Sequence, residues 1–182
     1  MVAKRAALMQ DAALMSGGEV AGRRGEARIA GIAAADAGAE NAAAIRVGHV
    51  YALRVYYEDT DAGGVVYHAN YLRFAERART EALREAGAPH AEMASEAGLF
   101  FMVRRVKVDY AAPARLDDSL LVVTRPVRIG AARVDLVQCV ERAGIVLASL
   151  EVGLACVRIA DGRPARIPPR WRAALARFAS GG

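Results

Sequence analysis

Apolar side chains recur at steps of three and four between residues 69 and 86, which is the clearest periodic pattern in this 182-residue chain. That spacing puts them on one face of a helix. Gly87 then fits a helix C-cap, and Pro89 prevents the helix from continuing. We therefore predict one long amphipathic helix over 69–86. Charged residues on its outer face are spaced to form three ion pairs: Arg73 with Glu76, Arg77 with Glu81, and Glu81 with Arg84.

Segments rich in β-branched and alternating apolar residues lie on both sides of this helix. One precedes it, and four follow after a short second helix predicted over 90–97. The five predicted strands cover residues 49–57, 100–110, 119–129, 133–142 and 146–159. A single long helix followed by a meander of strands indicates an α+β fold with an antiparallel sheet.

The two ends of the chain differ from this central part. Residues 1–46 are rich in Ala and Gly and lack a sustained apolar stripe, so we predict a disordered or weakly helical extension. The folded domain is predicted over 47–162. Residues 163–182 form a tail with five Arg and no acidic residue, and Trp171, Leu175 and Phe178 fall on one side of a short helix there. Two alternatives stay open for this tail: it packs on its own domain, or it contacts anionic lipid or an acidic partner.

Composition and charge narrow the class of protein. Hydrophobic residues make up 54% and charged residues 25% of the chain, and no apolar run reaches the length of a membrane span. Residues 47–162 hold 14 Arg and Lys against 15 Asp and Glu, which argues against a nucleic-acid-binding face. Cys139 and Cys156 lie in strand-like sequence without a CxxC motif, so we expect buried free thiols in a reducing compartment and no metal site.

The candidate chemistry lies in residues 57–71, YEDTDAGGVVYHANY. An acidic run ends in two glycines, and the predicted helix begins a few residues later. This order places a carboxylate beside a helix N-terminus, where free N–H groups can stabilise developing negative charge. An Asp beside Gly is also ordinary turn chemistry, and composition alone does not exclude that interpretation.

The same segment resembles a known family. Its key positions match, in order and spacing, the signature of the 4-hydroxybenzoyl-CoA thioesterase family of hotdog-fold proteins, and most closely its Tol–Pal-associated acyl-CoA thioesterase branch. The similarity continues through residues 101–120. The matching positions are Tyr57, Asp61, Gly64, Val66, His68 and Tyr71. The resemblance implies a hotdog fold, in which about five antiparallel strands wrap around one central helix, and it implies hydrolysis of acyl-CoA thioesters.

The resemblance also implies roles for individual residues. Asp61 would be the catalytic carboxylate, as a general base or as a nucleophile. The backbone N–H groups near Tyr67 and His68 would form the oxyanion hole. The His68 side chain would orient the reacting groups, or it has a structural role only. The substrate wall would include Tyr57, Gly64 and Val66, with core packing as the alternative for Tyr57.

Coenzyme A carries phosphates, so basic residues should lie near the mouth of its channel. Arg104, Arg105 and Lys107 are the candidates, and an ordinary solvated strand face is the alternative interpretation of them. No cofactor is expected beyond the coenzyme A of the substrate.

The expected partners are acyl-CoA and further copies of this chain, in a homodimer or tetramer, and no nucleic acid. We expect a cytoplasmic location, with a peripheral position at the inner membrane as the alternative through residues 163–182. The alternative function is a non-catalytic hotdog scaffold attached to a cell-envelope or lipid-synthesis complex. The apolar face of the predicted helix does not indicate which acyl group the substrate carries.

Overall fold

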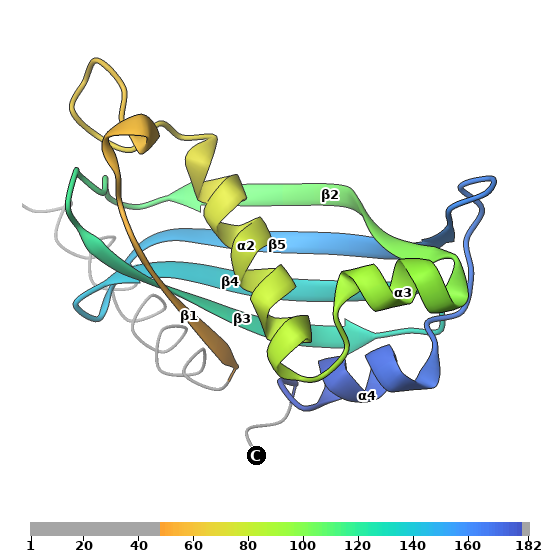
Figure 1. The fold of residues 1–182 in the computed structure, drawn as a ribbon. Helices are drawn as coiled ribbons and strands as arrows, with labels where there is room; N and C mark the ends of the chain where they lie inside the picture. The colour runs from red at the N-terminus through yellow and green to blue at the C-terminus, as the bar shows by residue number, and fades with distance from the viewer. Residues whose placement is uncertain (1–47, 180–182) are drawn as a thin grey trace, which may run out of the picture. The chain divides into compact units, whose positions relative to one another are not determined.

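The computed structural model describes residues 48–179, so the predicted extension over 1–46 lies outside the described residues. Five strands, three α-helices and one 3-10 turn make up this part of the chain (Figure 1). In chain order the elements are β1 (His49–Arg54), η1 (Tyr57–Asp59), α2 (Asn70–Glu85), α3 (His90–Ala97), β2 (Leu99–Tyr110), β3 (Ser119–Ile129), β4 (Arg133–Arg142), β5 (Ile145–Arg158) and α4 (Pro169–Ala176).

The strands form one antiparallel sheet in the order β1-β3-β4-β5-β2. Strands β3, β4 and β5 are a meander, while β1 and β2 form the two edges. Helix α2 crosses one face of the sheet, with α3 and α4 beyond its C-terminal end (Figure 1). The predicted α+β fold, with five antiparallel strands around one central helix, is confirmed.

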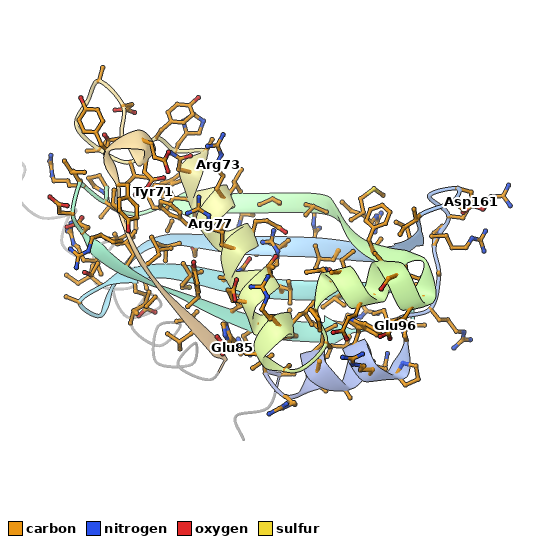
Figure 2. All side chains as sticks on the ribbon, in the orientation of Figure 1. Tyr71, Arg73, Arg77, Glu85, Glu96 and Asp161 are labelled. Atoms are coloured by element: carbon orange, nitrogen blue, oxygen red, sulfur yellow. The ribbon has the colours of Figure 1, made fainter. Side chains whose placement is uncertain are left out.

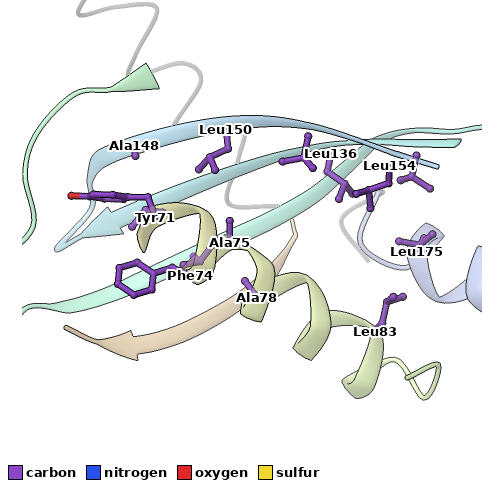
Figure 3. Close-up of a cluster of buried hydrophobic side chains, with 14 of the residues drawn as sticks. Tyr71, Phe74, Ala75, Ala78, Leu83, Leu136, Ala148, Leu150, Leu154 and Leu175 are labelled. Carbon is purple, nitrogen blue, oxygen red and sulfur yellow. The ribbon is translucent and has the colours of Figure 1, made fainter. Parts of the chain in front are cut away.

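The apolar stripe of α2 packs on this sheet face. Its members include Tyr71, Phe74, Ala75 and Ala78, all buried, and they meet Leu side chains from β4 and β5 (Figure 3). The alanines matter because their small side chains let the helix backbone lie close to the strands. The predicted helix face is therefore the face that fills the core.

A buried polar group also joins helix and sheet. Gln138 of β4 is fully buried, and its Nε2 donates to the Ala75 carbonyl at 2.9 Å and to Thr124 Oγ1 at 2.8 Å. Its Oε1 accepts from the Arg79 guanidinium at 2.6 Å. Because the amide is fully partnered, its burial carries no unsatisfied polar atom, and it fixes where α2 sits on the sheet.

Helix α4 packs on its own domain. Trp171, Ala174 and Leu175 belong to the main core. The Trp171 indole N–H donates to the Pro89 carbonyl at 3.3 Å, and Arg170 donates to the Gly87 carbonyl at 2.9 Å. This occupies the apolar face that the lipid-binding alternative requires. None of the helices in the described part of the chain is long and apolar enough to cross a membrane.

Two local predictions differ from the structure. The first strand was predicted over 49–57 but ends at Arg54, because the chain turns into η1, where the Tyr56 N–H donates to Asp59 Oδ2 at 2.9 Å. Of the three predicted helix ion pairs, only Glu81 with Arg84 forms. Glu76 pairs with Arg79, which leaves Arg73 and Arg77 without a carboxylate partner among residues 48–179.

Candidate active site

A tight loop carries the candidate carboxylate. The Asp61 N–H donates to the Val65 carbonyl at 3.0 Å, and the Gly64 N–H donates to the Asp61 carbonyl at 2.9 Å. Gly64 has a φ of +70°, which a side chain would strain. Thr60 and Val66 pair across the base of the loop. The two glycines of the motif therefore serve the turn, and the turn presents Asp61 outward.

The Asp61 carboxylate is exposed, and one of its oxygens is held. Asp61 Oδ1 accepts from the Gly63 N–H at 2.8 Å, and the second oxygen has no partner among residues 48–179. A Cβ added at Gly63 would lie 3.0 Å from Oδ1, so this position also favours glycine. Asp59, in contrast, is buried and bound to the Tyr56 N–H. One oxygen of Asp61 thus stabilises the turn, and the other is free to contact a substrate or water.

The Asp59 carbonyl connects the loop to the start of α2. It accepts from the Tyr67 N–H at 2.9 Å and from Asn70 Nδ2 at 2.9 Å, and Asn70 is buried. The Tyr67 amide is therefore occupied. The His68 amide makes no hydrogen bond within the described residues, so of the two amides named from the sequence it is the one available to a substrate oxygen.

Both peptide groups beside His68 are fixed. The Tyr67 carbonyl accepts from the Asn70 N–H at 2.8 Å, and the His68 carbonyl accepts from the Tyr110 hydroxyl at 2.9 Å. Burial raises the pKa of Tyr110, so its hydroxyl stays a donor at neutral pH. The exposed His68 ring packs between Tyr67 and Tyr110, with centroids 4.4 Å and 6.4 Å away.

Asn70 and Tyr110 were missed by the sequence analysis as site residues. A polar Asn within the apolar face of α2 was a signal for Asn70. The contact of Tyr110 with His68 spans 42 residues and depends on the fold, so no local pattern indicates it.

The remaining predicted wall residues lie around the loop. Val66 is buried, and its N–H donates to the Ala114 carbonyl at 2.9 Å, while Tyr71 Oη accepts from the Ala114 N–H at 2.9 Å. Tyr57 is 82% exposed, so within one chain it is an outward-facing residue and not part of the core.

A groove of about 450 Å³ runs between α2 and the edge strand β2. Its apolar lining includes Leu72, Val103 and Val106, and the unpaired Arg73 and Arg77 lie along it (Figure 2). The lining of the groove begins at Leu72, in the first turn of α2, and includes neither Asp61 nor His68.

The three predicted phosphate-binding residues lie elsewhere. Because Val106 and Val108 pack inward, Arg105 and Lys107 point to the opposite face of the sheet. Lys107 is 3.4 Å from both Asp109 and Glu151, and these carboxylates raise its pKa. Arg104 and Arg105 have no carboxylate partner among residues 48–179. The structure therefore does not gather these residues around Asp61 within one chain.

No group of three or more His, Cys, Asp or Glu side chains within residues 48–179 is arranged to hold a metal ion. Both cysteines are buried free thiols, as predicted, and burial raises the pKa of Cys139 to about 11. What the site offers is one exposed carboxylate, one free amide at a helix start and an apolar groove.

Comparison with known proteins shows which family this chain resembles. The model of the thioesterase-like superfamily matches residues 55–175. The acyl-CoA thioesterase YbgC of Haemophilus influenzae is 42% identical over 128 residues, covering 70% of this chain and 94% of the relative. The acyl-CoA thioester hydrolase YbgC of Escherichia coli O6:H1 is 44% identical over 117 residues, covering 64% and 87%. The crystal structure of a probable thioesterase from Bartonella henselae matches with a TM-score of 0.64 and 39% identity, covering 66% and 98%.

Proposed function

This chain belongs to the thioesterase-like superfamily of hotdog-fold proteins, and we propose that it hydrolyses acyl-CoA thioesters with Asp61 as its catalytic carboxylate. The observation that supports the assignment most is the pairing of an exposed carboxylate with the free amide of His68 at the start of α2. Hydrolysis needs a group that activates or replaces water and a donor for the oxyanion, and these two groups supply them.

As a general base, Asp61 takes a proton from a water molecule whose oxygen attacks the thioester carbonyl carbon. The electron pair of the carbonyl moves to its oxygen, which the His68 N–H stabilises. When the carbonyl re-forms, the C–S bond breaks, and the coenzyme A thiolate leaves and takes up a proton. The products are the free acid and coenzyme A.

As a nucleophile, Asp61 itself attacks the carbonyl carbon and expels the thiolate, which forms a mixed anhydride that water then hydrolyses. After a single turnover in ¹⁸O-labelled water, label in Asp61 identifies the nucleophilic route. Attack of water on the aspartyl carbonyl of an anhydride leaves label in Asp61, whereas the general-base route puts label only in the released acid. In either route the backbone N–H of His68 stabilises the negative charge on the carbonyl oxygen. The His68 ring packs on Tyr110 and so helps to orient the site.

The edge strand β2 is the proposed dimer contact. It is 12 residues long, and Phe100, Met102 and Val103 on it are 37%, 43% and 44% exposed. A long uncovered apolar edge favours pairing with another chain, and pairing with its own copy closes it. The groove between α2 and β2 would then gain a second wall from the partner. Tyr57, which is exposed, would meet that partner or the substrate.

The oligomer has a direct test. We expect an even number of subunits by light scattering at micromolar concentration. Met102→Lys with Val103→Lys places like charges on the edge and should give monomers that lose at least about tenfold in kcat/KM. A fully active wild-type monomer would contradict the proposal.

The function itself is tested by thiol release from a panel of short, long and aromatic acyl-CoAs. Turnover of at least one class above the spontaneous rate is the expected result. The absence of turnover on every class, with a folded protein, would favour the non-catalytic scaffold instead. A cytoplasmic location and a Tol–Pal connection stay predictions.

A further inference from the structure

Four arginines surround a hollow on the sheet face opposite α2. The hollow has a volume of about 690 Å³ and is lined by Arg104 and Arg105 of β2, Arg128 of β3 and Arg133 of β4, with Asp135 and Gly153 between them. The pairing of the strands produces this arrangement. Arg105 lies opposite Gly153, Gly153 opposite Asp135, and Asp135 opposite Arg128, in one row across four strands.

The charge of the hollow is not neutralised. None of the four arginines has a carboxylate oxygen within 4.0 Å among residues 48–179. On the same face, two residues along β2, Lys107 is flanked by Asp109 and Glu151. Asp135 is the single carboxylate in the hollow. Four positive charges against one negative charge leave a strongly cationic concavity.

Gly153 keeps the floor of the hollow open. Glycine inside a strand weakens it, and it often marks a place where a ligand approaches the backbone closely. A Cβ at this position would meet Asp135 Oδ1 at 3.5 Å and the Arg105 Cβ at 3.8 Å, which are ordinary contacts. Packing therefore does not require glycine here. A larger side chain would occupy the space between the arginines.

The dimensions favour a ligand with more than one anionic group. Neighbouring strands are about 4.8 Å apart, so the backbones of Arg105 and Arg128 lie about 14 Å apart across three such steps. Inward-reaching guanidinium groups at that separation hold two phosphates better than one. Asp135 between them accepts hydrogen bonds, which suits a ribose hydroxyl or a base amino group.

We propose that this outer hollow binds a nucleotide that carries separate phosphate groups, with Arg128, Arg133 and Gly153 as binding-site residues beside Arg104 and Arg105. Two sources share this chemistry: the nucleotide end of coenzyme A, in which case the inference rests on the proposed thioesterase function, and a free nucleotide. Guanidinium forks match phosphate oxygens two at a time, so binding should be steeply dependent on salt.

The test is calorimetric titration of the full chain with adenosine 3′,5′-bisphosphate at low and high salt. Binding that weakens with salt is expected, and adenosine without phosphates should not bind. Arg128→Ala with Arg133→Ala should raise Kd at least about tenfold. The control, Arg84→Ala with Arg158→Ala, removes the same charge from exposed ion pairs on α2 and β5 and should change Kd by less than about twofold.

Gly153→Val provides a second variant without any charge change. Valine suits a strand, so the fold should persist while the hollow is filled, and Kd should again rise at least about tenfold. Absence of binding to the wild-type protein would overturn the proposal. So would binding that neither the arginine pair nor Gly153→Val alters.

Kinetics with two substrates identify the source of the nucleotide. If coenzyme A is the ligand, the Arg128→Ala, Arg133→Ala variant has a raised KM for acyl-CoA and an unchanged kcat/KM for the matching acyl-pantetheine, which lacks the nucleotide. If KM for acyl-CoA is unchanged while nucleotide binding is lost, the ligand is a free nucleotide. Both results support the site. If the wild-type protein has no thioesterase activity, the proposed function is contradicted, but the calorimetric titration still tests whether the hollow binds a nucleotide.

Discussion

The two ends of α2 are built in different ways. At its N-terminal end the surrounding side chains are largely exposed, with Tyr57 82% and Tyr67 47% accessible, and a series of hydrogen bonds through Asp59, Asn70 and Tyr110 holds the backbone in place. At its C-terminal end α3 and α4 cover the helix, and the core includes Met93, Trp171 and Leu175 (Figure 1).

This difference separates stability from chemistry. Burial of apolar area stabilises the C-terminal end, because removing such side chains from water is the main favourable term in folding. The N-terminal end buries Tyr71 and Phe74 as well, but its amide and carboxylate must stay open to a substrate. Hydrogen bonds hold geometry there without closing the site. Substitutions at the two ends should therefore affect different measurements.

The largest effect is expected from Trp171→Ala at the packed end. Trp171 is 3% exposed, and its loss leaves a cavity beneath α4, so we expect the free energy of unfolding to fall by about 3–5 kcal/mol. Urea denaturation measures this change. Arg177→Ala, at the exposed C-cap of the same helix, is the control and should stay within about 0.5 kcal/mol. The folded fraction of Trp171→Ala should keep its activity. A loss of turnover in the folded protein would contradict the view that the packed end determines stability and the open end determines catalysis.

Asp61→Asn is expected to affect the open end alone. It keeps the side-chain oxygen that Gly63 binds and removes the charge, so turnover should fall by about 10²-fold or more. The unfolding midpoint and oligomer should not change, because Asp61 is exposed. Glu58→Gln removes a neighbouring exposed carboxylate and should leave turnover unchanged. Activity of Asp61→Asn within about threefold of wild type would rule out its assignment.

The sequence predicted the packed end better than the open end. Helix periodicity and strand alternation depend on neighbours a few residues apart, so α2, α3 and the five strands were found with small errors at their ends. The motif around Asp61 was local as well. The role of Tyr110, and the row that joins Arg105 to Arg128, could not be predicted, because they depend on which strands pair and in what register.

Tyr110→Phe tests whether hydrogen bonds position the open end. The change removes the hydroxyl that donates to the His68 carbonyl and keeps the ring contacts with His68 and Tyr71. The loss of one hydrogen bond should lower kcat by about threefold to tenfold with little change in KM. Tyr51→Phe on the other edge strand, β1, is the control, because its hydroxyl has no hydrogen bond among residues 48–179. An equal fall for both variants would show a general effect of the fold and not positioning of the amide.

The smallest expected effect concerns pH and a thiol far from the site. Burial raises the pKa of Cys139 to about 11, from an ordinary value of 9.0. Between these two values the unfolded chain loses a proton that the folded chain keeps, so stability falls as pH rises from about 9 to 11 and is unaffected below that window. Thermal midpoints across this range should decline less steeply in Cys139→Ala than in wild type. Tyr71 and Tyr110, whose pKa values are also raised by burial, titrate in both proteins, so the difference between the two curves isolates the thiol. Identical slopes would mean that Cys139 titrates normally in the folded protein and that the outer sheet face around it is open to water.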